Sequence, residues 1–461
     1  LKENLLTNSG FDVWSNSTLE VVDEMLANDS INSDGSATTG WNVYGGATLA
    51  GNQNGGTSGG HTGTSCITMT GDGATADNGM YSNGFDLVKG KLYKVTMWVK
   101  GDAGGDTWKT VINDNSGAGT WIGPGNVNST VNLTTSWAQY TWYGGVYEMA
   151  ESTTATARLY ILQIGDATGV MSVDDIKVEE VTPGCVGAND DGPDGWSKGG
   201  NANFKVYREH DGTYTKDGSY YALKVVTSSG GAGNGMQWPH ADIYGKDFFY
   251  RRFQGRTMTL GAWVWTATGS RIAMRLEDND GNSNSTQHTG ASRWEWLEVT
   301  RTCDSSITEF AVRFRSDNDL TYYVSQPMLV FGSSIGEGNY TRPQGEIVWF
   351  EESDYSFNSY SGVTVGSNAE VNLEAESNGK IPKGAKAVHG RVVGVHAGTG
   401  EHLQLAPSNS TEGSVSVISQ VSGVAIEALG WCPCDSDGDI WIRVGASMTN
   451  VYLKVNGVEL R

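Results

Sequence analysis

The chain has 461 residues and a formal net charge of −21, with 63 glycines, 16 tryptophans and 9 prolines. This charge argues against a phosphate-rich partner such as nucleic acid, and no apolar run reaches the roughly 18 residues that predict membrane insertion as a helix. The length suits about three domains, and the many turn residues between short aromatic-rich runs predict an all-β fold.

The first predicted element is the stretch "NLLTNSGFDVW", residues 4–14. We expect it to form the first edge of the first β domain. The following stretch, Thr18–Leu26, is the one place where the apolar spacing also suits a helix. The five cysteines are too few and too scattered for a disulfide framework.

Several segments recur in the same order further along the chain. The segment "GTSCITMTG" (63–71) resembles "GSYYALKVV" (218–226), and "GKLYKVTMWVKGDAG" (90–104) aligns with "GRTMTLGAWVWTATG" (255–269), which places Trp98 over Trp263. The segments 112–117, 136–142 and 171–178 align with 276–281, 293–299 and 322–329, and "GW" occurs at both 40–41 and 195–196. Ordered recurrence of this kind predicts two copies of one domain.

Turn-rich linkers set the expected boundaries at residues 1–182 for the first copy, 183–343 for the second and 344–461 for a different, C-terminal β domain. Each copy contains about eight short strands, the number expected of a jelly-roll β-sandwich. The predicted fold class is therefore all-β, with two tandem β-sandwich (jelly-roll) domains and a smaller C-terminal β-sandwich. In the last domain, Asn456-Gly457 predicts a hairpin turn.

The first copy resembles the jelly-roll carbohydrate-binding modules that are attached to many glycanases. The resemblance rests on "NLLTNSGFDVW", "GTSCITMTG", "YKVTMWVKG" and the closing "MSVDDIKVEEV", and it covers nearly all of residues 4–181. The second copy resembles the same module with weaker ends. The resemblance implies a glycan, from a host or from the environment, as a partner, although one fold serves many functions.

The C-terminal part resembles the terminal domains of bacteriophage tail fibres and related virion appendages. The phrases "RPQGEIVWFEESDY" and "NLEAESNGKIPKGAKAV" carry this resemblance. It implies a structural protein on a virion surface or otherwise outside the cell, in contact with other virion proteins. Because such appendages are commonly trimers, we expect a homotrimer with the third domain at the contact.

The resemblance to carbohydrate-binding modules also implies a structural Ca²⁺ ion that joins the first strand to the last. The matching positions are Asp12 in the opening stretch and Asp174 with Asp175 in the closing one. Calcium takes several hard oxygen ligands, which carboxylates supply. The alternative is that Asp12 caps a turn and Asp174 lies in solvent. The second copy has Ser325-Gln326 in place of the two acids, so we expect no such site there.

Two other acidic turns, Asp278–Gly281 and Asp435–Asp439, contain half of a calcium-loop pattern. Neither has the distal glutamate at the full spacing. An ordinary turn between strands is the alternative for both.

Sugar binding requires aromatic ring faces beside hydrogen-bonding groups. Strand alternation in 92–100 places Trp98 on the more polar face of its strand. The candidate glycan-binding residues are Trp98, Trp108, Trp142 and Tyr143 in the first copy and Trp263 and Trp265 in the second, with Trp121, Trp294 and Trp296 as further aromatic candidates. The alternative is that these rings form core or domain contacts.

The sequence predicts a protein without catalytic activity, since no glycosidase carboxylate pair, metal-hydrolase spacing or nucleophile motif can be assigned. Three functions stay open. The first is a tailed-phage fibre or decoration protein that presents glycan-binding modules. The second is a secreted or cell-surface carbohydrate-binding protein, and the third is a structural filament or capsid spacer without a ligand.

Overall fold

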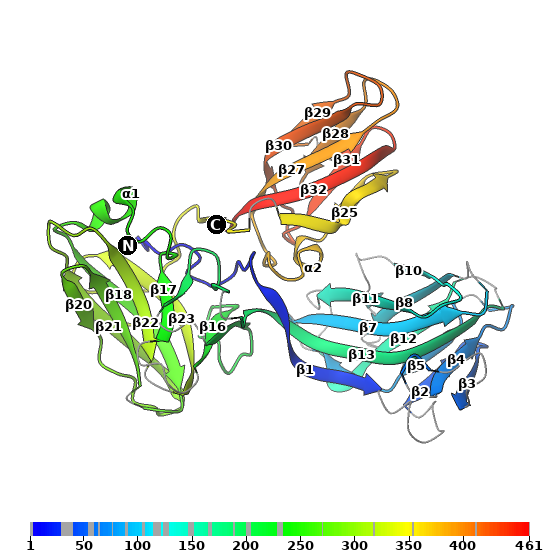
Figure 1. Ribbon diagram of the computed structural model, residues 1–461, viewed down its shortest axis with the longest axis horizontal. Coiled ribbons are helices and arrows are strands. Elements are labelled where there is room, and N and C mark those ends of the chain that lie inside the picture. Colours follow the sequence, from blue (N-terminus) through cyan, green and yellow to red (C-terminus); the bar gives the residue numbers. More distant parts are fainter. Residues whose placement is uncertain are drawn as a thin grey trace. The chain divides into compact units, whose positions relative to one another are not determined.

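The computed structural model describes residues 3–28, 40–53, 60–62, 65–75, 77–87, 91–103, 107–113, 121–122, 129–145, 152–164, 168–187, 190–199, 204–227, 234–269, 271–316, 319–352, 355–410 and 413–460. These residues form an almost entirely β structure, as predicted, with two very short α-helices (Figure 1). The chain divides into two compact units. One unit is Glu20–Thr182, and the other combines Leu1–Leu19 with Pro183–Arg461.

The unit Glu20–Thr182 is a β-sandwich. Its strands are β1 (Thr18–Asn28), β2 (Trp41–Tyr44), β3 (Thr48–Gln53), β4 (Ser65–Thr70), β5 (Gly79–Ser82), β6 (Phe85–Leu87), β7 (Leu92–Gly101), β8 (Thr107–Asn113), β9 (Trp121–Ile122), β10 (Ser129–Asn132), β11 (Ala138–Gly145), β12 (Ser152–Gln163) and β13 (Val170–Cys185). One sheet has the order β11-β7-β13-β4-β3, with β1 also on β13, and the other has the order β10-β8-β12-β5-β2. We refer to this unit as the first jelly roll.

The alternation of side chains along β7 explains why its sheet has one apolar and one polar face. Tyr93, Val95 and Met97 are buried in the core between the sheets, whereas Lys94 and Trp98 between them are half-buried on the outer face. Successive side chains of a strand point to opposite faces, so this pattern fixes the orientation of β7. The predicted placement of Trp98 on the polar face is confirmed.

The larger unit contains the second jelly roll. Its elements are β14 (Ser197–Gly199), β15 (Lys205–Glu209), β16 (Ala222–Thr227), β17 (Asn234–Trp238), α1 (Asp247–Tyr250), the 3₁₀ turn η3 (Arg251–Phe253), β18 (Thr257–Thr266), β19 (Ile272–Asp278), β20 (Gly281–Asn284), β21 (Arg293–Thr302), β22 (Phe310–Ser316) and β23 (Leu320–Phe331). One sheet runs β15-β16-β23-β18-β21, joined at β15 by the last two residues of β13, and the other runs β14-β17-β22-β19-β20.

The same unit contains the C-terminal β domain, a second two-sheet structure with its own hydrophobic core. Its elements are β24 (Ile347–Trp349), β25 (Tyr355–Val365), β26 (Ala369–Val371), α2 (Leu373–Glu376), β27 (Ala387–Val395), β28 (His402–Ala406), β29 (Val415–Ile418), β30 (Ala425–Pro433), β31 (Ile440–Val444) and β32 (Met448–Glu459). The sheets are β24-β32-β27-β30, with β25 on β32, and β26-β31-β28-β29.

The hairpin predicted at Asn456-Gly457 is wrong, because both residues lie inside β32. His389 pairs with Gly457 and Gly390 pairs with Val455, which leaves Asn456 as an extra residue in the ladder. The Asn-Gly pair therefore marks a β-bulge within a strand rather than a turn between two strands.

The strand registers support the predicted repeat. Trp98 pairs with Asp174 and Trp263 pairs with Ser325, each beside a shift in register. The next residues, Asp175 and Gln326, both have left-handed backbone, with φ of 48° and 53°. The alignment of 63–71 with 218–226 is off by one residue, because Ile67 pairs with Val173 and Leu223 pairs with the equivalent Val324.

The opening stretch does not form the edge of the first jelly roll. Leu6, Phe11 and Trp14 are fully buried in the core of the second jelly roll. The backbone of the opening stretch also bonds to the second jelly roll, because the Leu5 amide donates a hydrogen bond to the Leu329 carbonyl at 2.8 Å. The first jelly roll is therefore inserted within the chain of the other unit. The segment Thr18–Leu26, for which a helix was an alternative, lies within strand β1.

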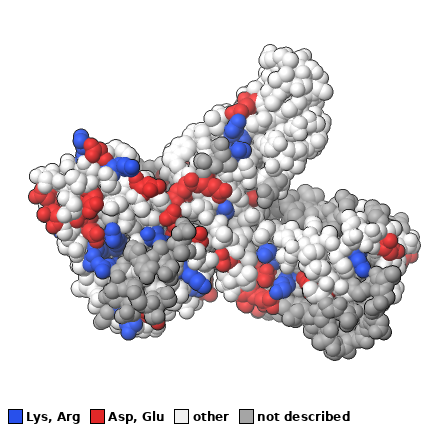
Figure 2. Space-filling view, viewed as in Figure 1, with Lys and Arg blue, Asp and Glu red and all other residues white. Residues whose placement is uncertain are grey.

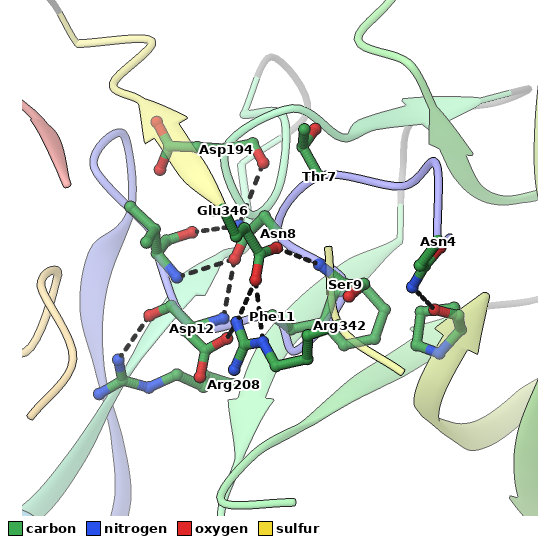
Figure 3. A network of polar contacts seen from close by, with 12 residues as sticks. Asn4, Thr7, Asn8, Ser9, Phe11, Asp12, Asp194, Arg208, Arg342 and Glu346 are labelled. Atoms are coloured by element: carbon green, nitrogen blue, oxygen red, sulfur yellow. Dashed lines mark hydrogen bonds and ion pairs between the residues drawn. The ribbon is translucent and has the colours of Figure 1, made fainter. Parts of the chain in front are cut away.

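Buried polar contacts fix the opening stretch in place (Figure 3). The Asn8 side chain accepts from the amides of Asp12 and Val13 and donates to the carbonyls of Val13 and Asp194. The Asp12 carboxylate accepts from the Arg342 guanidinium at 2.5 Å, and the same guanidinium pairs with Glu346 at 2.8 Å. An apolar segment held by such satisfied polar groups adopts one defined path.

Charged side chains are unevenly distributed on the visible face of the protein. Figure 2 shows that the visible face of the C-terminal β domain carries few of them. Among the described residues, no helix combines the length and apolar character needed to cross a membrane.

Candidate functional site

An aromatic group lies on the outer, polar face of the sheet that contains β7. The His61 ring stacks on Trp98, with ring centres 3.6 Å apart and planes 10° apart. Trp137, just before β11, meets His61 edge to face at 6.2 Å. All three side chains are half-buried. We call Trp98, His61 and Trp137 the Trp98 platform.

Two adjacent carboxylates of β13 hold the loop that carries His61. Asp174 accepts from the backbone amides of His61 at 2.7 Å and Thr62 at 3.1 Å. Asp175 contacts the His61 Nδ1 at 2.8 Å and accepts from the Thr62 hydroxyl at 2.6 Å. Burial raises the pKa of Asp174, while the amide hydrogen bonds act in the opposite direction. The carboxylates therefore position the imidazole over Trp98.

The sequence places this loop against the sheet through a glycine. A Cβ atom on Gly60 would come within 2.3 Å of the Ser65 carbonyl oxygen and 2.8 Å of an Asp174 carboxylate oxygen. Such distances are too short for any side chain at this position, so glycine is required. The site thus depends on β7 for Trp98, on β13 for the two acids and on Gly60 for the close approach of the loop.

Hydrogen-bonding groups surround the platform. Gln139 lies opposite Trp98 on β11 and is exposed. The Lys100 ammonium lies 4.9 Å from the centre of the Trp137 ring, a cation–π distance. Ring faces next to amide, ammonium and carboxylate groups suit a ligand that has both apolar faces and hydroxyl groups.

The other candidates of the first jelly roll occupy different places. Tyr143 is half-buried on the same outer face, opposite Lys94, and burial together with Glu179 raises the pKa of its hydroxyl. Trp108 and Trp142 are buried in the core, and the Trp142 indole donates to the Thr110 hydroxyl at 2.7 Å. The assignment of these two tryptophans as ring faces for a ligand was wrong, because both point between the sheets.

The equivalent position in the second jelly roll is covered. Trp263 is 8% exposed, and the Lys216 ammonium lies 4.5 Å from its ring centre. Trp296 meets its edge at 5.8 Å. A lysine thus occupies the place over the repeated tryptophan that His61 occupies in the first jelly roll.

Trp265 of the second jelly roll is half-buried in a separate aromatic cluster. It meets Tyr214 at 4.8 Å and Tyr323 at 5.4 Å, both edge to face. Tyr214 and Tyr323 stack with their ring centres 4.2 Å apart. The rings therefore pack mainly on one another.

The three acids expected to bind Ca²⁺ have protein partners, each within its own unit of the chain. Asp12 belongs to the larger unit and pairs with Arg342, whereas Asp174 and Asp175 belong to the first jelly roll and hold the His61 loop. Ca²⁺ binding by these acids stays a prediction.

The two acidic turns have protein partners. Asp278 accepts two hydrogen bonds from the Arg301 guanidinium, at 2.8 and 2.6 Å. Asp435 accepts from the amides of Asp437 and Asp439 in its own turn, both at 2.9 Å. The Asp435 contacts are those of an ordinary turn, whereas Asp278 forms an ion pair with an arginine of β21. Ca²⁺ binding at either turn stays a prediction.

Sequence reasoning missed His61, Trp137 and Lys216. Trp137 could have been found, because the repeat aligns it with Trp294, which had been noted in the second copy. His61 and Lys216 lie in loops and reach the tryptophans only through the fold. A loop residue of this kind carries no periodic signal.

Comparison with known proteins finds a family match for part of the chain. Residues 3–167 match the family model described as a carbohydrate binding domain, which is less than half of the chain. These residues form a carbohydrate-binding-module-like region, and such a domain is not catalytic in itself. Among curated proteins, no sequence matches this chain.

Solved structures with a similar chain path include modules of xylanases. The N-terminal tandem of two CBM22 domains of Xyn10C from Paenibacillus barcinonensis is 15% identical, covers 68% of this chain and 99% of its own, and has a TM-score of 0.33. Its CBM22-1 xylan-binding domain alone is 17% identical over 35% of this chain and 96% of its own, with a TM-score of 0.28. The CBM22-1–GH10 modules of Xyn10B from Clostridium thermocellum are 21% identical over 34% of this chain and 28% of their own, with a TM-score of 0.26. Likenesses this distant do not assign a ligand or a residue role.

Proposed function

We propose that this protein binds a polysaccharide through the Trp98 platform of the first jelly roll. The observation that carries the proposal is the half-buried group of Trp98, His61 and Trp137 on the polar face of a sheet. The match of residues 3–167 to a carbohydrate binding domain supports it.

Binding follows from the two kinds of group at this site. The C–H face of a pyranose ring packs against an aromatic face, which removes apolar area from water. The sugar hydroxyls exchange hydrogen bonds with exposed polar groups such as Gln139 and the Lys100 ammonium beside Trp137. The loop of His61 is fixed by Asp174 and Asp175, so the site loses little entropy when a glycan binds.

The second jelly roll contributes less to this proposed activity. Both tryptophans have a side chain over the ring, but Trp263 is only 8% exposed under Lys216, whereas Trp98 with its stacked His61 is half-buried, so less ring area is open to a sugar in the second copy. The two copies therefore differ in function although their strands correspond.

We further propose, from the sequence resemblance alone, that the protein is a virion surface component that attaches a phage to host or environmental glycans. A homotrimer through the C-terminal β domain belongs to this proposal. That domain exposes Val421, Val424 and Leu429, each more than half accessible, which is the kind of surface that a subunit contact covers. A secreted carbohydrate-binding protein is the alternative setting for the same binding site. Imaging of assembled particles with a specific antibody distinguishes the two.

The binding activity is tested on a glycan array with the full chain, its Trp98→Ala variant and a Trp349→Ala control. Trp349 is 54% exposed in the C-terminal β domain, so the Trp349→Ala substitution removes a comparable surface ring away from the Trp98 platform. We expect one group of related glycans to bind the wild type and the control, and Trp98→Ala to lose the signal. Failure of the wild type to bind any glycan would refute the proposal.

A further inference from the structure

A histidine and two carboxylates come together in the larger unit, away from the Trp98 platform. One ligand atom each of Asp191, His240 and Glu351 lies within 4.8 Å of the other two. The His240 Nε2 and an Asp191 carboxylate oxygen are 3.0 Å apart. We propose that these three residues bind one divalent transition-metal ion, with Zn²⁺ as the representative ion.

The three residues come from segments far apart in the chain. Asp191 lies between β13 and β14, His240 follows β17, and Glu351 follows β24. The first two belong to the second jelly roll and the third begins the C-terminal β domain. Because no local turn requires this arrangement, the fold itself gathers the three side chains.

Other contacts fix the Glu351 side chain in place. One of its carboxylate oxygens accepts from the Gly195 amide at 2.8 Å, and the other accepts from the Asn16 side chain at 2.8 Å. Its own amide donates to the buried Asp194 at 2.7 Å. Each carboxylate oxygen has a second lone pair, so these hydrogen bonds leave capacity for a metal ion.

The two ring nitrogens of His240 have different surroundings. Nδ1 accepts a hydrogen bond from the Asp242 amide at 3.4 Å, and the exposed Asp242 carboxylate lies 3.8 Å away. Nε2 is buried, has no hydrogen-bond partner of ordinary geometry among the described residues and faces Asp191. A buried ring nitrogen of this kind is a second indication that Nε2 is directed at a ligand.

The donor set indicates the class of ion. One imidazole and two carboxylates suit Zn²⁺ and its neighbours, with water completing a four-coordinate site. Ca²⁺ takes six to eight oxygen ligands and is disfavoured by an imidazole. The Asp191 side chain is 40% exposed and that of His240 is 17% exposed, so an ion can enter from solvent. A bound ion would link the second jelly roll to the C-terminal β domain.

The test uses the full, tag-free chain after treatment with a chelator. Zn²⁺ and, separately, Ca²⁺ are titrated by calorimetry, and Co²⁺ is added to read its visible spectrum, which reports the coordination geometry. We expect saturable Zn²⁺ binding with one ion per chain, a raised melting temperature and no comparable Ca²⁺ binding at the same concentrations. The alternative is a simple ion pair between protonated His240 and Asp191, which predicts no saturable Zn²⁺ binding.

Three variants assign the site. His240→Gln and Glu351→Gln should each weaken Zn²⁺ binding by about tenfold or more, whereas His396→Gln, in the C-terminal β domain, should leave it unchanged. Circular dichroism shows whether each variant is folded, and Glu351→Gln keeps the size of the side chain and one of its two hydrogen-bond acceptor oxygens. Absent Zn²⁺ binding in the wild type, or equal binding in wild type and both site variants, would overturn the proposal.

Discussion

Trp98 and Trp263 show how one residue position acquires two roles. Each lies beside a register shift that occurs in both copies of the repeat. However, His61 stacks on Trp98, whereas the Lys216 ammonium covers Trp263. The difference comes from the loops, since the strands are equivalent. Whether the tryptophan ring is open to a ligand therefore depends on the one loop side chain that packs on it.

At a second residue, Asp439, we expect the stability of the C-terminal β domain to depend on pH. Burial raises the pKa of Asp439 to about 7, although it accepts from the Leu373 amide. The folded state therefore binds this proton more tightly than the unfolded state, whose aspartate has an ordinary pKa near 4. The contribution to stability is greatest below about pH 4 and is lost as the pH rises to about 7, at up to about 1.4 kcal/mol per pH unit.

Differential scanning calorimetry of wild type and Asp439→Asn checks this expectation. The variant keeps an oxygen acceptor for Leu373 and removes the titration. The melting temperature of the affected transition in the variant should rise relative to wild type between pH 4 and pH 7, and the difference should be constant above that. A difference that does not change with pH would contradict the assignment.

At the scale of elements, the opening segment shows what the sequence could and could not predict. The repeat, with its recurring Gly-Trp pairs at 40–41 and 195–196, and the strand alternation of β7 follow from local patterns. The domain against which "NLLTNSGFDVW" packs does not follow from local patterns, because apolar residues of this kind suit the core of either copy. Long-range choices of this kind are decided by the tertiary packing.

Leu6 tests the placement of the opening segment. It is fully buried in the core of the second jelly roll, and Leu6→Ala should destabilise that unit by about 2–5 kcal/mol. Met97→Ala, in the core of the first jelly roll, is the matched control for the other unit. Calorimetry with limited proteolysis identifies which unit unfolds earlier in each variant. If Leu6→Ala lowered the melting temperature of the first jelly roll instead, the described packing would be incorrect.

At the scale of the whole molecule, the first jelly roll is an insertion that carries the proposed binding site entirely within itself. The Trp98 platform and its supporting acids all lie within Glu20–Thr182. The platform is therefore separate from the other two tested sites, since the Asp191 cluster and Asp439 both belong to the larger unit.

The insertion makes a prediction about fragments. A fragment of residues 20–182 should fold and remain monomeric, whereas a fragment of residues 1–182 exposes Leu6, Phe11 and Trp14, which then lack their core. We expect the longer fragment to bind a hydrophobic dye and to aggregate at lower concentration. Light scattering and dye fluorescence on the two fragments compare them directly, and equal behaviour would argue against the insertion.

The most direct test of the central claim is the affinity of the full chain for its best array glycan, measured by calorimetric titration of wild type, Trp98→Ala and Trp349→Ala. Loss of one stacking ring at the platform should weaken binding by about tenfold or more, which corresponds to about 1.4 kcal/mol, while the Trp349→Ala control should bind like the wild type. Unchanged affinity in a folded Trp98→Ala variant would contradict the assignment of the Trp98 platform as the glycan-binding site.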